Sequence, residues 1–339
     1  MALSGSGTHT IGLWPVIAAL VGNSLVATIK FAVAIASGSS SMFSESIHSF
    51  ADMANQALLL IGLRRSRKKA TKGYHYGYGR ERFFWALISA CGIFFVGAGV
   101  TVYHGISTII EPEALEISRT IFTVLFISFV IELWTLAVAL RSLQKMFPEE
   151  TWRERIELAD PTTLAICLED SVAVIGVGIA AGSISLAYYT GNPVWDALGS
   201  IVIGGLLGIV AITLIIKNRS YLIGRAIPED MREEIIEVLV ADPAIEKVID
   251  FKSAVLDIGV YRIKCEVEMN GSALLKEAYR HGSLRDEYDG VKNDFEEFKR
   301  FCVDYADRIP RLIGKHIDKV EAKLMKKFPS VRHIDIEIN

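Results

Sequence analysis

The chain has 339 residues, of which 51% are hydrophobic and 22% are charged. This balance is too apolar for an ordinary soluble domain and too charged for a protein that lies wholly within a membrane. The formal net charge of −3 disfavours a nucleic-acid partner, and the four cysteines lack the CxxC pairing typical of a zinc ribbon or a disulfide scaffold.

The long apolar runs all lie within the first 217 residues, and each is long enough to cross a bilayer. The N-terminus MALSGSGTHT lacks the basic region of a signal peptide, so the first run is interpreted as a true span. A transmembrane domain is therefore predicted over residues 1–220. Its six expected transmembrane helices cover approximately 12–36, 42–63, 83–109, 118–140, 161–187 and 194–217.

Positive charge is concentrated in the loops on one side of these spans. Eight Lys or Arg residues lie between Arg64 and Arg82, and others follow the fourth and the sixth spans. The opposite loops, at 37–41, 111–118 and 188–193, are short or acidic. The positive-inside rule then places both termini in the cytoplasm, and we expect an integral protein of the plasma membrane or of a bacterial inner membrane.

Residues 221–339 have the pattern of a small cytoplasmic α+β domain. A helix is expected over 229–241, two strands around the turn Asp257–Ile258–Gly259, and an amphipathic helix over 304–328. The alternating SVRHIDIEIN at the C-terminus predicts a third strand. This αββαβ order is typical of a ferredoxin-like sheet that is covered on one face by helices. The charged interval 271–303 is a helical insertion that either extends the long helix or stands apart from it.

Ionisable side chains interrupt the second and fifth expected spans. The second span contains SESIHSFADM, in which His48 and Asp52 lie one helical turn apart, with Glu45 on the same face. The fifth span contains CLEDSVAVIG, with Glu169 beside Asp170. At 1.5 Å per residue, the two aspartates each lie about 14–15 Å inside the membrane, near the midplane. Imidazole and carboxylate groups at that depth suit zinc or a similar divalent ion.

Plainer interpretations of these residues are also open. His48 would then be a hydrogen-bonded packing residue, and the carboxylates would pair between helices or relay protons. Lys30 in the first span either pairs with a carboxylate such as Glu45 or Asp196 or extends toward the membrane surface. Glu132 in the fourth span is assigned no transport role.

The stretch SGSSSMFSESIHSFADMANQALLLIGLRRS resembles the second span of the cation diffusion facilitator family, in which two metal ligands have H/D-xxx-D spacing. Other similar features are Asn23 and Lys30 in the first span, the loop sequence YGYGRER and DSVAV in the fifth span. The sixth span and its exit into the C-terminal domain are similar as well, over the run PVWDALGSIVIGGLLGIVAITLIIKNRSYLIGRAIPED. The likeness covers the whole order of elements. The sequences of these motifs are more similar to the branch that contains the mitochondrial zinc transporter of animals than to the bacterial exporters.

This resemblance implies a homodimeric exporter of divalent cations, mostly of zinc, that is driven by proton antiport. The metal ion is then a substrate and protons are the counter-ion, with no permanent cofactor. The resemblance identifies His48, Asp52 and Asp170 as ligands of the transport site.

The fourth ligand of the family is not present in its usual place. The family has His or Asp four residues before the aspartate of the fifth span, and that residue is Ile166 here. Glu169 is favoured as the replacement, because the ED pair is typical of this branch. Cys167, Glu45 and water are the alternatives, and Asn23 is a further auxiliary residue.

Two more positions are candidates for additional metal sites. The family loop often begins with a histidine, but the matching residue is Tyr74 and His75 follows it. His75 is thus a candidate for a loop site, against the alternative of a solvated loop histidine. In the tail, His333 and Asp335 share one face of the last strand, near which family members bind regulatory metal.

Together these features predict a secondary active transporter rather than an enzyme, working by alternating access in a lipid bilayer. A membrane-embedded zinc hydrolase is one alternative, but the sequence contains no HExxH motif. A membrane sensor that binds metal without moving it is the other, and the missing fourth ligand keeps it open.

Overall fold

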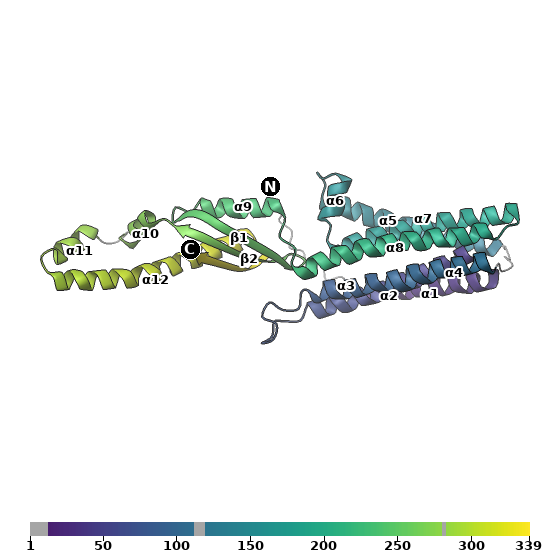
Figure 1. Ribbon diagram of the computed structural model, residues 1–339, viewed down its shortest axis with the longest axis horizontal. Coiled ribbons are helices and arrows are strands. Elements are labelled where there is room, and N and C mark those ends of the chain that lie inside the picture. The colour runs from purple at the N-terminus through teal and green to yellow at the C-terminus, as the bar shows by residue number, and fades with distance from the viewer. Residues whose placement is uncertain (1–12, 112–118, 280–282) are drawn as a thin grey trace. The chain divides into compact units, whose positions relative to one another are not determined.

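The computed structural model describes residues 13–111, 119–279 and 283–339, with residues 13–23 described by their backbone alone. The chain divides into two compact units, one that extends to Leu222 and one formed by Ile223–Asn339 (Figure 1). The side chain of Asn23 and most of the acidic loop at 111–118 lie outside the described residues.

The first unit consists of helices in its described part. The helices α3, η1 and α4 follow one another without a break, with η1 as a π-helical turn inside one long helix. The bounds are α1 Leu13–Ser37, α2 Ser40–Ser66, α3 Glu81–Gly92, η1 Ile93–Ala98, α4 Gly99–Ile110, α5 Arg119–Met146, α6 Trp152–Leu158, α7 Pro161–Thr190 and α8 Val194–Ile223.

Four helices in the described part of the chain are long and apolar enough to cross a membrane, namely Glu81–Ile110, α5, α7 and α8. They correspond to the third to sixth expected spans. The first two expected spans fall on α1 and α2. In α1 the described apolar stretch is the shorter Ser24–Ser37. Although α2 has 27 residues, it is not one of the four, since its serines and ionisable side chains lower its hydropathy.

The start of α2 is held by the first turn of α8. Ser39 is the N-cap residue, and its hydroxyl accepts a hydrogen bond from the backbone N–H of Met42. Asp196 of α8 accepts the N–H of Ser40 at 2.5 Å and the hydroxyl of Ser39 at 3.0 Å. A carboxylate at a helix N-terminus complements the helix dipole and the unpaired N–H groups. This contact sets the position from which α2 carries its polar side chains into the bundle.

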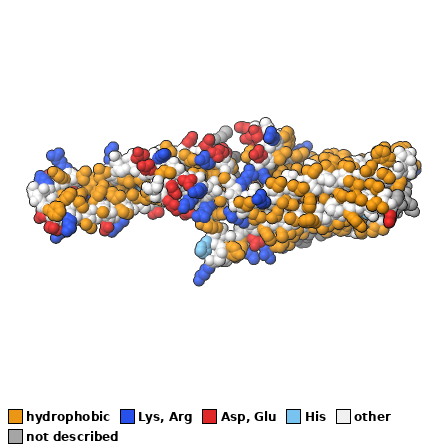
Figure 2. Space-filling view, viewed as in Figure 1, with side chains coloured by type: hydrophobic (Ala, Val, Ile, Leu, Met, Phe, Trp, Pro, Cys, Tyr) orange, Lys and Arg blue, Asp and Glu red, His pale blue; other side chains and the backbone are white. Residues whose placement is uncertain are grey.

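Helix α2 packs along α1, α3 and α7, and α5 packs along α7. The core between these helices is formed by apolar side chains such as Met42, Ile121 and Leu207. Hydrophobic side chains cover most of the visible face of this unit, whereas charged side chains gather at the end that holds the α2–α3 loop and α6 (Figures 1 and 2). An apolar surface of this kind fits a lipid environment.

The second unit contains a three-stranded sheet, which confirms the three predicted strands. β1 (Ile245–Asp257) is antiparallel to β2 (Val260–Met269), and β2 is parallel to β3 (Val331–Ile338), in the order β1-β2-β3. The turn between the first two strands uses Gly259 at φ +70°, a conformation that glycine adopts without strain.

Helices α9 (Glu229–Val240) and α12 (Phe295–Lys327) bury their apolar residues against this sheet. The core of the second unit includes Leu239, Leu324, Ile263 and Val267, each at most 1% exposed. The alternation predicted for the second strand thus separates this core from charged residues on the opposite face.

The charged interval 271–303 forms both of the structures that its sequence left open. α10 (Gly271–Ala278) and α11 (Leu284–Val291) are separate short helices, while the last part of the interval extends α12 toward the N-terminus. Asp294 caps α12 by accepting the N–H groups of Glu296 and Glu297, which explains why this helix begins at Phe295 and not at 304. Residues 280–282 lie outside the described part.

Candidate metal site

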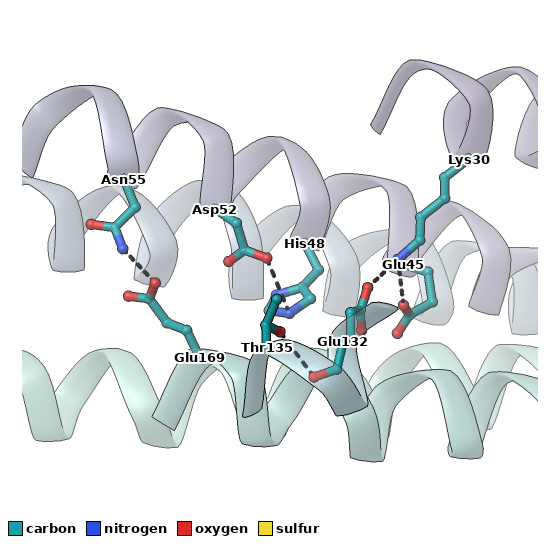
Figure 3. Close-up of polar contacts among 8 residues, drawn as sticks. All are labelled: Lys30, Glu45, His48, Asp52, Asn55, Glu132, Thr135 and Glu169. Carbon is teal, nitrogen blue, oxygen red and sulfur yellow. Dashed lines mark hydrogen bonds and ion pairs between the residues drawn. The ribbon is translucent and has the colours of Figure 1, made fainter. Parts of the chain in front are cut away.

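A polar stripe runs along α2 inside the helical unit. It consists of Glu45, His48, Asp52 and Asn55, whose spacing of three, four and three residues places them on one helical face. Figure 3 shows these side chains in a row that faces α5 and α7. Glu45, His48 and Asn55 are at most 4% exposed. Such a buried polar row requires partners or a ligand.

His48 and Asp52 form the pair that the one-turn spacing predicted. The Nε2 atom of His48 lies 3.5 Å from Oδ2 of Asp52, and the Asp52 side chain is 27% exposed. Among the described residues, neither ring nitrogen of His48 has a hydrogen-bond partner. Ring nitrogens without a hydrogen bond on a buried imidazole are unfavourable in a packing residue, whereas a metal ion would satisfy one of them.

Glu169 lies one step further along the stripe, against Asn55. The side-chain amide of Asn55 donates a short hydrogen bond to Oε2 of Glu169, and the hydroxyl of Ser89 donates to Oδ1 of Asn55 at 2.6 Å. These two bonds join α7, α2 and α3. Figure 3 shows the first of them, between Asn55 and Glu169. The other carboxylate oxygen of Glu169 has no hydrogen-bond partner within the described part of the chain. The structure thus pairs Glu169 with Asn55 and leaves it apart from His48 and Asp52.

The other expected ligands on α7 occupy different environments. Asp170 is half-buried and Cys167 is buried, while Ile166, at the place of the missing family ligand, is 45% exposed. No three His, Cys, Asp or Glu side chains of the described residues lie close enough together to hold a metal ion. Of the expected ligands, the structure brings His48 and Asp52 together and does not gather Asp170 or Glu169 into the same cluster.

Glu132 of α5 carries a half-buried carboxylate to which the sequence alone assigned no role. The ammonium of Lys30 lies 2.7 Å from Oε1 of Glu132 and 3.3 Å from Oε2 of Glu45. Lys30 therefore pairs with Glu45, one of the two partners considered from the sequence, and with Glu132, which was not considered. The signal available beforehand was a single acidic residue in the middle of an otherwise apolar span.

A comparison with known families bears directly on this arrangement. Residues 16–223, which contain the polar stripe and its partners, match the family model described as the cation efflux transmembrane domain. The chain belongs to the cation diffusion facilitator family, also called the cation efflux family. The resemblance inferred from the sequence motifs is thereby confirmed.

Individual members of the cation efflux family match almost the whole chain. The chain is 36% identical to the mouse "Proton-coupled zinc antiporter SLC30A9, mitochondrial" over 95% of its own length and 58% of that protein. It is 38% identical to "Metal tolerance protein C4" of Arabidopsis thaliana over 93% of the chain and 71% of that protein. The chain therefore spans little more than half the length of the mouse relative.

The names of these relatives correct the expected location. The mouse and human zinc antiporters are both named as mitochondrial proteins, which contradicts the expectation of a plasma membrane or bacterial inner membrane. That expectation rested on loop charges, which report the orientation of the spans and carry no information about which membrane holds them.

The two other candidate sites of this cation efflux protein are the loop residue His75 and the pair His333 and Asp335 on the last strand. His75 lies exposed in the α2–α3 loop. On β3, Asp335 is engaged by Arg262 of the neighbouring strand, with 3.0 Å between Nη2 and Oδ2. His333 is paired in register with the same arginine. The His333–Asp335 face is thus lined by a cation from the adjacent strand, which competes with a metal ion for the carboxylate.

Proposed function

We propose that this protein exports divalent metal ions, principally zinc, across a membrane in exchange for protons. The observation that carries the proposal is the buried His48 ring, which lies 3.5 Å from Asp52 with neither nitrogen hydrogen-bonded among the described residues. The mouse relative, named a proton-coupled zinc antiporter, supports the same substrate and counter-ion.

We further propose that six helices span the membrane. The described stretch of α1 is apolar, and α2 lies in contact with α1, α3 and α7, so its polar face is turned into protein and not toward lipid. The Lys- and Arg-rich segments near α6 and in the α2–α3 loop support an orientation in which both termini lie on the same side of the membrane as these segments. The second unit is proposed to be a ferredoxin-like dimerisation and regulatory domain, with His333 and Asp335 as its metal-sensing residues.

The proposed transport ligands are His48, Asp52 and Asp170. Binding of zinc requires a neutral imidazole and ionised carboxylates, so the arriving ion displaces protons from these groups. Glu169 is proposed as the fourth ligand. To bind the metal ion, its carboxylate would give up the hydrogen bond from Asn55. Because Asp170 and Glu169 lie on α7 whereas His48 and Asp52 lie on α2, a relative movement of these helices would assemble and open the site.

Transport can be tested with the purified protein in lipid vesicles that contain a zinc-sensitive dye. We expect zinc entry to increase when a pH gradient drives protons outward, and to fall when Asp52 is replaced by alanine. Zinc binding that persists without any gradient-dependent entry would support the metal-sensor alternative. Entry that neither responds to the gradient nor changes in Asp52→Ala would contradict the proposal.

A further inference from the structure

Lys30 forms ion pairs that connect three helices inside the helical unit. Its side chain comes from α1 and is fully buried, and its ammonium contacts Glu45 of α2 and Glu132 of α5 at 3.3 Å and 2.7 Å (Figure 3). Two carboxylates thus face a single ammonium. The group carries one net negative charge when all three side chains are ionised, in a part of the protein where unbalanced charge is strongly unfavourable.

The two carboxylates are only half satisfied by this contact. Within the described part of the chain, Oε1 of Glu45 and Oε2 of Glu132 have no hydrogen-bond partner. The imidazole of His48, three residues after Glu45 on the same face, makes no hydrogen bond among the described residues and has Asp52 as its ion-pair partner at 3.5 Å. The structure therefore contains more buried acceptors around the Lys30 ammonium than that ammonium satisfies.

Space around Glu45 is provided by a neighbouring glycine. A Cβ atom placed on Gly176 of α7 would lie 2.5 Å from Oε1 of Glu45. Any side chain at this position would therefore displace the carboxylate. The absence of a side chain at Gly176 lets Glu45 keep its unpaired oxygen turned toward α7, within the bundle.

We propose that Glu45 and Glu132 form a second divalent-cation site, which the Lys30 ammonium fills as a tethered cation. In the native protein Lys30 then restricts the membrane unit to the ion held at His48 and Asp52. Two facing carboxylates with an imidazole nearby suit a cation that accepts both oxygen and nitrogen ligands, such as Mn²⁺. The inference uses the proposed function only to assign the His48–Asp52 pair, and the second site can exist without it.

A purely structural ion pair would behave differently when the lysine is removed. If Lys30 only joins helices, Lys30→Met should weaken the protein without creating affinity for a cation. If Lys30 occupies a cation site, the same change should expose two carboxylates that bind a divalent ion in its place. The two interpretations therefore differ in the number of ions bound by the variant.

The test counts Mn²⁺ ions bound per chain by equilibrium dialysis and elemental analysis of the full-length protein in detergent. We expect Lys30→Met to bind an additional Mn²⁺ ion relative to the wild type, and Lys30→Met/Glu132→Gln to lose that gain. Lys145→Met, the same change at an exposed position of α5, is the matched control and should leave the count unaltered. A monodisperse Lys30→Met protein with the wild-type count would overturn the proposal.

Two further measurements make the result independent of folding and of the transport site. If Lys30→Met is unstable without metal, Mn²⁺ should raise its melting temperature far more than that of the wild type, and failure of Mn²⁺ to stabilise it would also overturn the proposal. In a His48→Ala/Asp52→Ala background, the gain caused by Lys30→Met should persist. If His48→Ala/Asp52→Ala binds fewer ions than the wild type, the His48–Asp52 pair is a metal site. If it binds as many, the proposed transport site fails, while a retained Lys30→Met gain still supports the second site.

Discussion

Asn55 of α2 donates a hydrogen bond to Glu169 of α7, although the two residues are 114 positions apart in the chain. The same asparagine accepts the hydroxyl of Ser89 from α3. One amide therefore satisfies partners on two other helices, with both its donor and its acceptor groups in use. This contact holds Glu169 against Asn55, which lies three residues after Asp52 on the same face of α2.

Replacement of Asn55 by leucine is expected to destabilise the helical unit. The change keeps the side-chain volume similar but leaves Glu169 and Ser89 without their partner, which costs about 1–3 kcal/mol for a buried polar group. The melting temperature of the purified variant measures the effect. In the double variant Asn55→Leu/Glu169→Met the loss should be smaller than the sum of the single losses, because both partners are then apolar. Additive losses would show that the two side chains are not coupled.

Removal of the Asp52 carboxylate should impair metal binding. In Asp52→Asn we expect zinc affinity to fall by more than about tenfold, since the effect of losing even a supporting group of a metal site is about 10- to 100-fold. Isothermal titration of the detergent-purified protein with zinc is the measurement. The exposed Asp304→Asn in α12 provides the control and should bind as the wild type does. Equal affinities in all three proteins would remove Asp52 from the proposed ligands.

The core of the second unit can be tested with two neighbouring residues of α9. Leu239 is 0% exposed and Val240 is 54% exposed. Leu239→Ala should destabilise this unit by about 2–5 kcal/mol, as expected for a large-to-small change in a packed core. Val240→Ala should stay within about 0.5 kcal/mol of the wild type. Limited proteolysis of Ile223–Asn339 within the full chain reports the difference, and similar cleavage of both variants would contradict the packing described.

The cysteines of the second unit should differ sharply in their reactivity. Cys265 is 1% exposed in β2, and burial raises the pKa of its thiol to about 12, whereas Cys302 of α12 is exposed. At pH 8 only about 1 in 10,000 Cys265 side chains is a thiolate, the form that reacts with iodoacetamide. Mass spectrometry should therefore find Cys302 alkylated first, with Cys265 modified after denaturation. Comparable labelling of both in the native protein would contradict the burial of Cys265.

Local patterns in the sequence predicted a substantial part of this structure. Helical spacing alone indicated that Glu45, His48 and Asp52 share one face of α2, because side chains three or four residues apart lie above one another in any α-helix. Alternation predicted the strands β2 and β3 for a similarly local reason. The motifs of the first, second, fifth and sixth spans and of the loop YGYGRER were specific enough in combination to indicate the family, which the match over residues 16–223 confirms.

Contacts between distant residues were beyond the reach of those patterns. Sequence patterns indicate Glu45 as a partner of Lys30 but give no role to Glu132, which the structure shows to be a second partner. They also indicate Glu169 as a metal ligand, whereas in the structure Glu169 accepts a hydrogen bond from Asn55. Such partners depend on the rotation and depth at which separate helices pack, and side-chain periodicity within one helix specifies neither quantity. The sequence by itself determined which helical faces are polar. Only the tertiary structure decided which charge meets which across the bundle, because that choice is made by packing between α1, α2, α5 and α7.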